Sequence, residues 1–111
     1  MFEKNLNIGL LLDFYGDVLN ERRRDALDFY YNNDMSLSEI AEEMSITRQG
    51  ARDLIKKAEE ELLFYEEKLG LAKKLKSVID SLGELEKIAV GTSLPEPFYE
   101  KLAELKTIVS Q

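Results

Sequence analysis

The middle of the chain carries basic and amide side chains at a spacing that is typical of nucleic-acid recognition. Arg48, Arg52 and Lys56 recur every four residues, so a helix would place them on one face. Gln49 lies beside Arg48, and Arg and Gln can form paired hydrogen bonds with guanine and adenine edges. With Lys57 and one acid, Asp53, the segment 47–57 carries a net charge of +3. We therefore interpret this segment as a candidate DNA-reading surface.

A second basic run, Arg22-Arg23-Arg24, is a candidate for contacts with phosphate groups. The alternative is that both basic groups form ordinary solvated helix faces. The net charge of the chain is −7, so the residues outside 47–57 must carry −10, which argues against binding that ignores sequence. Acidic residues also flank the candidate surface, at Glu39, Glu42, Glu43 and 59–61, and they would repel DNA unless they point away from it.

The residues before this surface predict the corner of a helix-turn-helix. Ser36-Leu37-Ser38-Glu39 has the form of a capping box, which starts a helix. A tight turn is expected at Ser45-Ile46, and Thr47 is the expected N-cap of the second helix. Small or apolar residues are placed to fill the corner: Ile40, Ala41, Met44, Ile46, Ala51 and Leu54. Such a corner holds the first turn of the second helix outward, toward the major groove.

The whole chain of 111 residues is expected to be all-α, because apolar residues recur at helical spacing and no alternating pattern is present. The expected helices cover about 5–18, 21–32, 37–44, 48–69 and 71–90, and a last helix after Leu94-Pro95-Glu96-Pro97 reaches Ser110. We predict a helix-turn-helix domain over 1–70 and a C-terminal helical extension over 71–111.

The later helices carry apolar seams that favour helix-on-helix packing. Leu75, Val78, Leu82, Leu85 and Ala89 are spaced three and four residues apart, as are Phe98, Leu102, Leu105 and Val109. The seams are explained either by a core within one chain or by an interface with another. Leu63 and Phe64 lie off the apolar stripe of their own helix, which favours a homodimer.

The composition argues against catalysis, metals and cofactors. The chain has no Cys and no His, which removes thiolate chemistry and the commonest general base. Asp13 and Asp17 are one helical turn apart and are a possible cation pair, but an exposed face explains them better. We expect a non-enzyme with no cofactor and no metal. No apolar run is long enough to span a membrane and no signal peptide is evident, so we expect a cytoplasmic protein without a membrane partner.

Two families share these patterns. Residues 19–62 resemble region 4 of the sigma-70 family, which reads the −35 promoter element. LLDFYGDVLNERRRDALDFYY and SLSEIAEEMSITRQGARDLIKKAEEELLFYEEKL, within residues 10–69, resemble the YlxM family of small bacterial proteins encoded beside signal recognition particle genes. The resemblance implies an all-helical fold and an accessory role in that pathway, with signal recognition particle components as partners. A DNA-binding regulator and a protein or RNA adaptor of the secretion machinery both fit.

Overall fold

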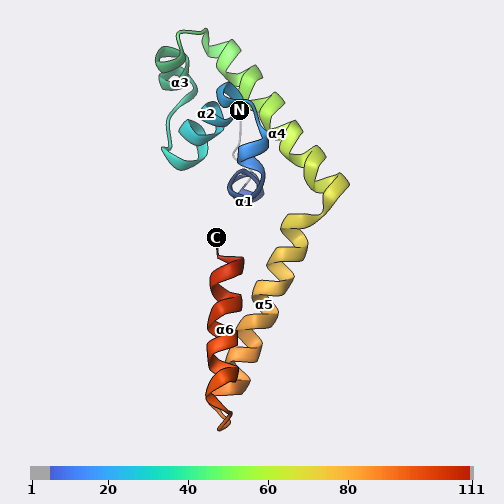
Figure 1. Ribbon diagram of the computed structural model, residues 1–111. Helices are drawn as coiled ribbons and strands as arrows, with labels where there is room; N and C mark the ends of the chain where they lie inside the picture. Colours follow the sequence, from blue (N-terminus) through green and yellow to red (C-terminus); the bar gives the residue numbers. More distant parts are fainter. Residues whose placement is uncertain (1–5, 111) are drawn as a thin grey trace. The chain divides into compact units, whose positions relative to one another are not determined.

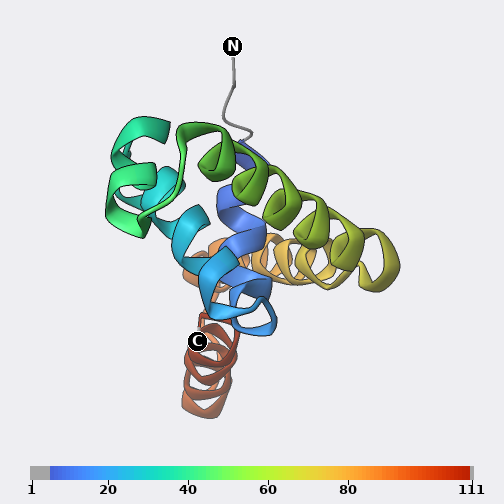
Figure 2. The ribbon, with the colours of Figure 1, turned by 90° about the horizontal axis from the view of Figure 1, so that it is seen from above.

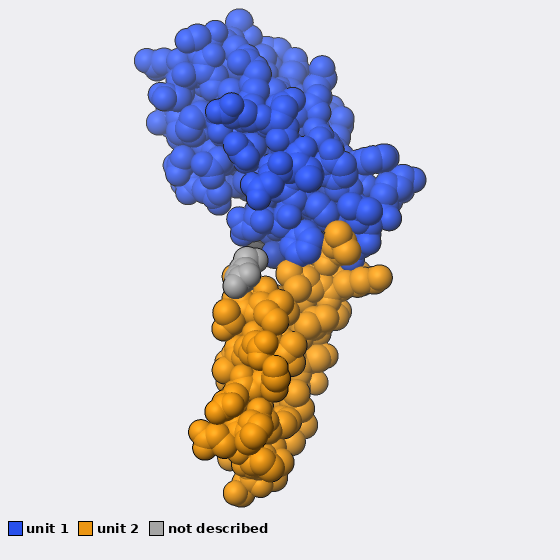
Figure 3. All heavy atoms as spheres, viewed as in Figure 1, with its two compact units in different colours: residues 1–70 blue, residues 71–111 orange. Residues whose placement is uncertain are grey.

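The computed structural model describes residues 6–110, and these residues form six α-helices and no β-strand (Figure 1). The helices are α1 (Leu6–Tyr15), α2 (Glu21–Leu27), α3 (Leu37–Met44), α4 (Arg48–Leu69), α5 (Leu71–Val90) and α6 (Glu96–Val109). The predicted all-α class is confirmed. The chain divides into two compact units, Met1–Gly70 and Leu71–Gln111, which Figure 3 shows in different colours.

In the first unit, α4 is the element against which α1, α2 and α3 pack, as Figures 1 and 2 both show. One face of α4 is buried over its first four turns, through Ala51, Ile55, Ala58 and Leu62. The largest fully buried side chains opposite this face come one from each neighbouring helix: Ile8, Leu27 and Ile40. The core therefore fixes the position of α4, whose first turns carry the candidate surface.

Local side-chain chemistry determines where these helices begin. The Asn20 side chain accepts a hydrogen bond from the Arg23 amide at 2.8 Å and starts α2. Ser36 and Glu39 form the predicted capping box at the start of α3. At the other end of α4, Gly70 has φ +61°, the left-handed conformation that a glycine adopts without steric cost, and it ends the helix.

Two predicted helices are shorter than expected. The first ends at Tyr15 and is followed by a 3₁₀ turn, Gly16–Val18. The second ends at Leu27 and continues as a π-helical segment, Asp28–Asn32, in which the Asn33 amide donates to the Asp28 carbonyl across five residues. This wider segment buries Tyr30 while the Tyr31 hydroxyl bonds Glu59 of α4.

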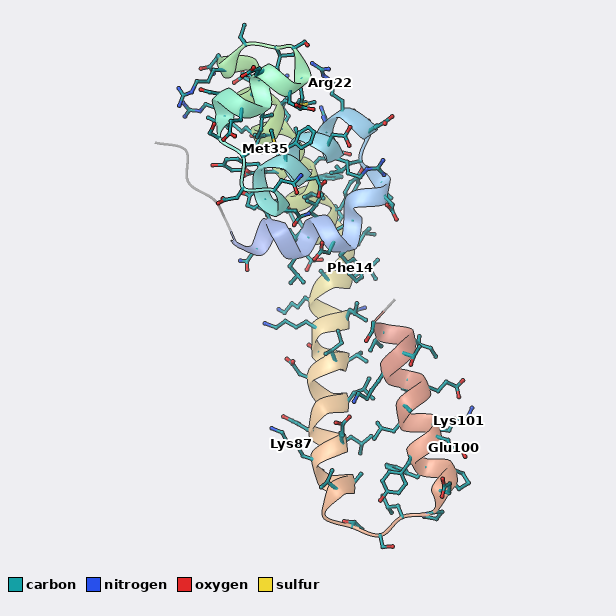
Figure 4. The ribbon with its side chains drawn as sticks, turned by 90° about the vertical axis from the view of Figure 1, so that its left-hand side faces the viewer. Phe14, Arg22, Met35, Lys87, Glu100 and Lys101 are labelled. Carbon is teal, nitrogen blue, oxygen red and sulfur yellow. The ribbon has the colours of Figure 1, made fainter. Side chains whose placement is uncertain are left out.

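The second unit is a hairpin in which α5 and α6 lie side by side and run in opposite directions (Figure 4). The Tyr99 hydroxyl donates to the carbonyl oxygens of Ala89 and Thr92 at 3.2 and 2.9 Å, which ties the start of α6 to the end of α5. Pro97 lies in the first turn of α6, where its missing amide hydrogen costs no helical bond. No helix within residues 6–110 has the length and hydropathy that a membrane span needs.

Candidate nucleic-acid interface

The turn between α3 and α4 has the hydrogen bonds of a Schellman motif. Ser45 adopts a left-handed conformation, with φ +57°, at the end of α3. The Ile46 amide donates to the Ala41 carbonyl at 2.9 Å, and the Ser45 amide donates to the Glu42 carbonyl at 3.3 Å. Only three residues separate the two helices, so the turn holds the start of α4 firmly against α3. The predicted break at Ser45-Ile46 is confirmed.

The corner behind this turn is filled as the sequence predicted. Ile40, Ala41 and Ala51 are buried. Met44, Ile46 and Leu54 are partly buried around them. Because Ala41 and Ala51 are small, α3 and α4 can approach closely at this point. The corner is a rigid base for the exposed first turns of α4.

The first three turns of α4 expose the predicted basic residues. Thr47 is the N-cap, and its Oγ1 accepts a hydrogen bond from the Gly50 amide at 2.9 Å. Arg48 and Gln49 follow in the first turn and are exposed, and so is Arg52 in the second. Lys56 and Lys57 are exposed further along the same helix. All five side chains are therefore exposed on α4, and Arg48, Arg52 and Lys56 follow one another at four-residue spacing along it.

Gln49 has a neighbour that the sequence reasoning did not assign to it. Its Nε2 donates a 3.0 Å hydrogen bond to Asp53 Oδ1, one turn further along α4. Gln and Asp four residues apart on a helix are a known favourable pair, so the spacing alone was a usable signal. To pair with a base edge, the Gln49 side chain must either break its hydrogen bond with Asp53 or use the second hydrogen of its amide nitrogen.

The three arginines of the Arg22-Arg23-Arg24 run have different surroundings. Arg22 is exposed at the start of α2, where Figure 4 labels it. Arg23 forms an ion pair and hydrogen bond with Glu61 of α4. Arg24 Nη1 lies 3.7 Å from Asp17 Oδ1. Arg22 is therefore the member of the run best placed for an external anion, whereas Arg23 joins two helices.

Glu61 is the acceptor that keeps the Arg23 side chain against α4. The Tyr65 hydroxyl also donates to Glu61, to its Oε2 at 2.7 Å. Burial works against ionisation of Glu61, but the hydrogen bonds from Tyr65 and Arg23 outweigh it, so the pKa of Glu61 lies below its ordinary value. Glu61 is thus a charged acceptor within the first unit.

The other acids of the flanking runs differ in their surroundings. Glu59 is partly buried, and burial raises the pKa of this carboxyl although the Tyr31 hydroxyl bonds it at 3.0 Å. Glu39 belongs to the capping box, and Glu42, Glu43 and Glu60 are exposed. Two of the three acids at 59–61 are therefore engaged by neighbouring helices.

The acidic pair considered as a cation site lies elsewhere in the first unit. Asp13 and Asp17 are both exposed and line a hollow together with Asp25, Asp28 and Arg24. Within residues 6–110, no group of three or more such side chains is arranged to hold a metal ion. The hollow is separate from the first turns of α4, and its acids would repel a nucleic acid.

Comparison with known proteins assigns the chain to a family. A family model described as "Putative helix-turn-helix protein, YlxM / p13 like" matches residues 2–103. A UPF0122 protein of Listeria welshimeri is 42% identical over 109 residues, which cover 97% of this chain and 99% of the relative. A UPF0122 protein of Desulforamulus reducens is 40% identical over 108 residues, with 94% and 92% covered. The resemblance to the YlxM family is confirmed, and the chain belongs to the UPF0122 family of YlxM / p13-like helix-turn-helix proteins.

Proposed function

We propose that this protein is a DNA-binding regulator that reads its site with the start of α4. The observation that carries the proposal is the exposed basic start of a helix, held by a buried two-helix corner. In this proposal Arg48 and Gln49 contact base edges, because the first turn of such a helix enters the major groove. The function is binding, and no catalytic step is required.

Phosphate contacts come from residues further from the helix start. Later turns of a recognition helix climb toward the DNA backbone, which assigns phosphate contacts to Arg52, Lys56 and Lys57. Among the three arginines of the α2 run, we propose Arg22 as the main phosphate contact and Arg23 and Arg24 as weaker ones. The ion pairs of Arg23 with Glu61 and of Arg24 with Asp17 reduce what these two can offer.

A titration with two variants tests this division of roles. A preferred duplex is first selected from random-sequence DNA with the wild-type protein. Arg48→Ala should then weaken binding to that duplex by about 1–3 kcal/mol and reduce its preference over other sequences. Lys56→Ala should weaken binding to all sequences alike and lower the slope of log affinity against log salt by about 1.

The control for these variants is Lys87→Ala, which makes the same change in charge in the second unit. In Figure 4 the Lys87 side chain points away from α6. This variant should bind DNA like the wild type. If the wild type prefers no duplex at low salt, or if Lys87→Ala weakens binding as much as Arg48→Ala, the DNA proposal is wrong.

A second candidate is a protein or RNA adaptor in the cytoplasmic secretion machinery. The observation that favours it is that Gln49 is bonded to Asp53 and Arg23 to Glu61, which leaves fewer donors for DNA. The family resemblance extends this candidate to an accessory role in the signal recognition particle pathway. Co-purification from cells with signal recognition particle RNA or protein, lost in an Arg48→Ala/Arg52→Ala variant, would support the adaptor over the regulator.

A further inference from the structure

The α5–α6 hairpin leaves much of its apolar surface uncovered. Between residues 71 and 110, the buried side chains are those of Ala72, Ala89 and Leu102. Two of these three are alanines, so the hairpin has a small core for its length. Larger apolar side chains remain exposed along it: Val78, Ile79, Leu85, Ile88, Leu105 and Ile108. A two-helix unit of this size needs further apolar contacts to be stable.

The apolar seam of α5 consists of two alternating positions in each heptad, and one of these two positions is exposed. Leu75 and Leu82 are partly buried and Ala89 is buried, whereas the alternate seam positions, Val78 and Leu85, are 47% and 38% exposed. Because a seam position recurs every seven residues, Val78 and Leu85 lie above one another on the helix. A shallow groove runs between them, over Ser77, Ser81 and Leu82.

The apolar residues of α6 lie on the same side of the hairpin. Glu86 and Lys106 form an ion pair between the two helices. Leu85 and Leu105 each precede a member of this pair by one residue, which turns each side chain about 100° around its own helix axis. Because the two helices are antiparallel, these rotations carry Leu85 and Leu105 to the same side of the hairpin, away from the ion pair. We call this surface, made by Val78, Leu85, Leu105 and Ile108, the open face.

The charges along α5 indicate what covers the open face. Residues 71–79 of α5 carry Lys73, Lys74 and Lys76 and no acid, while residues 80–90 carry Asp80, Glu84, Glu86 and a single lysine. Two copies of α5 in antiparallel orientation would place each basic half beside an acidic half. A parallel pair would place the lysines beside one another. A surface that complements itself on a two-fold rotation is the requirement for a symmetric dimer.

We propose that the open face binds a second copy of this chain, with α5 antiparallel to α5 and the two-fold axis near Ser81. This arrangement places Val78 against Leu85 of the second copy, and Leu85 against its Val78. Ser81 is small and lies in the groove between these residues, so the two helices approach most closely there. The result is a four-helix bundle of two hairpins. The proposal does not depend on what the first unit binds.

Adjacent residues of α5 supply a matched pair of variants. Val78 lies on the open face, whereas Ile79, which is 44% exposed, lies near Glu86 and Lys106 on the other side. The wild type should sediment at micromolar concentration as a particle of twice 12.8 kDa. Val78→Glu should raise the dimer dissociation constant at least tenfold, because it buries two carboxylates in the interface. Ile79→Glu should leave the constant within about threefold of the wild-type value.

Introduced cysteines test the orientation, because the chain has no natural cysteine. Ser81→Cys should form a disulfide-linked dimer on mild oxidation, since a disulfide needs Cα atoms about 4.4–6.8 Å apart. Lys74→Cys is the control. In the antiparallel pair its two copies lie about 22 Å apart along the helices, which prevents a disulfide. A parallel pair would link both variants equally.

A monomeric wild type would overturn the proposal. Equal crosslinking of Lys74→Cys and Ser81→Cys, or a dimer unaffected by Val78→Glu, would overturn the proposed interface. Circular dichroism of each variant checks that it is helical. If Val78→Glu fails to fold, the crosslinking yields of the two cysteine variants decide the question by themselves.

Discussion

The Gly50 amide donates a 2.9 Å hydrogen bond to Thr47 Oγ1, and a Cβ atom on Gly50 would lie 3.0 Å from the same oxygen. The residue that completes the cap of α4 therefore has little room for a side chain. Contacts this short are rare for real Cβ atoms, so the Thr47 side chain would have to shift and weaken its hydrogen bond. The glycine costs helix stability but leaves the cap of α4 intact.

Gly50→Ala should stabilise the protein less than an ordinary Gly→Ala change in a helix. Alanine is favoured over glycine by roughly 1 kcal/mol in helix interiors. Gly9 in α1 is the matched control, because no atom lies within 4 Å of a Cβ built there. Measured by urea unfolding, Gly9→Ala should raise the free energy of unfolding by close to 1 kcal/mol, that is, by about the full helix preference for alanine. Gly50→Ala should raise it by at least about 0.5 kcal/mol less than Gly9→Ala does.

A double-mutant cycle identifies the cause of that difference. Thr47→Ala removes the crowded oxygen and should cost about 1 kcal/mol as the loss of a cap. In the Thr47→Ala protein, Gly50→Ala should raise the free energy of unfolding by as much as Gly9→Ala raises it in the wild type. Equal gains for Gly50→Ala with and without Thr47 would show that Oγ1 is not the obstacle.

The capping box of α3 should make part of the stability depend on pH. Hydrogen bonds from the Ser36 amide and from its side chain lower the pKa of Glu39 below its ordinary value of 4.5. A carboxyl whose pKa is lowered by folding stabilises the protein above its unfolded pKa, and this contribution is lost as the pH falls through the folded pKa. The stability advantage of wild type over Glu39→Gln should therefore be present at pH 7 and decline below about pH 4.5.

Ser36→Ala provides the comparison for this measurement. It removes the hydroxyl that completes the capping box but leaves the Ser36 backbone amide. The free energies of unfolding of Ser36→Ala and of the double variant Ser36→Ala/Glu39→Gln are measured in urea from pH 7 to pH 3. Their difference should depend less on pH than the difference between wild type and Glu39→Gln. An unchanged pH dependence would mean that the hydroxyl does not contribute to the lowered pKa.

Much of the local structure was predictable because its causes lie within a few residues. The caps at Asn20, Thr47 and the Ser36–Glu39 box each depend on a side chain that bonds an amide three residues away. Gly70 ends α4 through its own backbone freedom. The buried corner at Ala41 and Ala51 follows from the spacing of small and apolar residues.

Partners distant in sequence were not predictable in the same way. Tyr15 donates to Glu66 at 2.7 Å across 51 residues, and Arg23 pairs with Glu61 across 38. Such contacts depend on how α1 and α2 pack on α4, which the pattern of either helix alone does not determine. For this reason Arg22-Arg23-Arg24 looks like one basic run in the sequence, although the fold gives Arg22 and Arg23 different surroundings.

Arg22 and Arg23 should therefore respond differently to the same substitution. Arg22→Ala should leave the free energy of unfolding within about 0.5 kcal/mol of the wild-type value, because Arg22 is exposed. If Arg22 contacts phosphate, this variant should bind DNA more weakly and lower the salt slope by about 0.9. Arg23→Ala should destabilise the protein by roughly 1–2 kcal/mol, because Glu61 loses a charged hydrogen-bond donor in a partly buried position.

Urea unfolding and DNA titration of the two variants separate these effects. Arg23→Lys keeps the positive charge, so it should recover part of the stability that Arg23→Ala loses, although one ammonium replaces the planar guanidinium. If Arg23→Ala were as stable as the wild type and bound DNA as weakly as Arg22→Ala, the two arginines would be equivalent. The ion pair with Glu61 would then contribute nothing to joining α2 and α4, and the run would act as one phosphate-binding group.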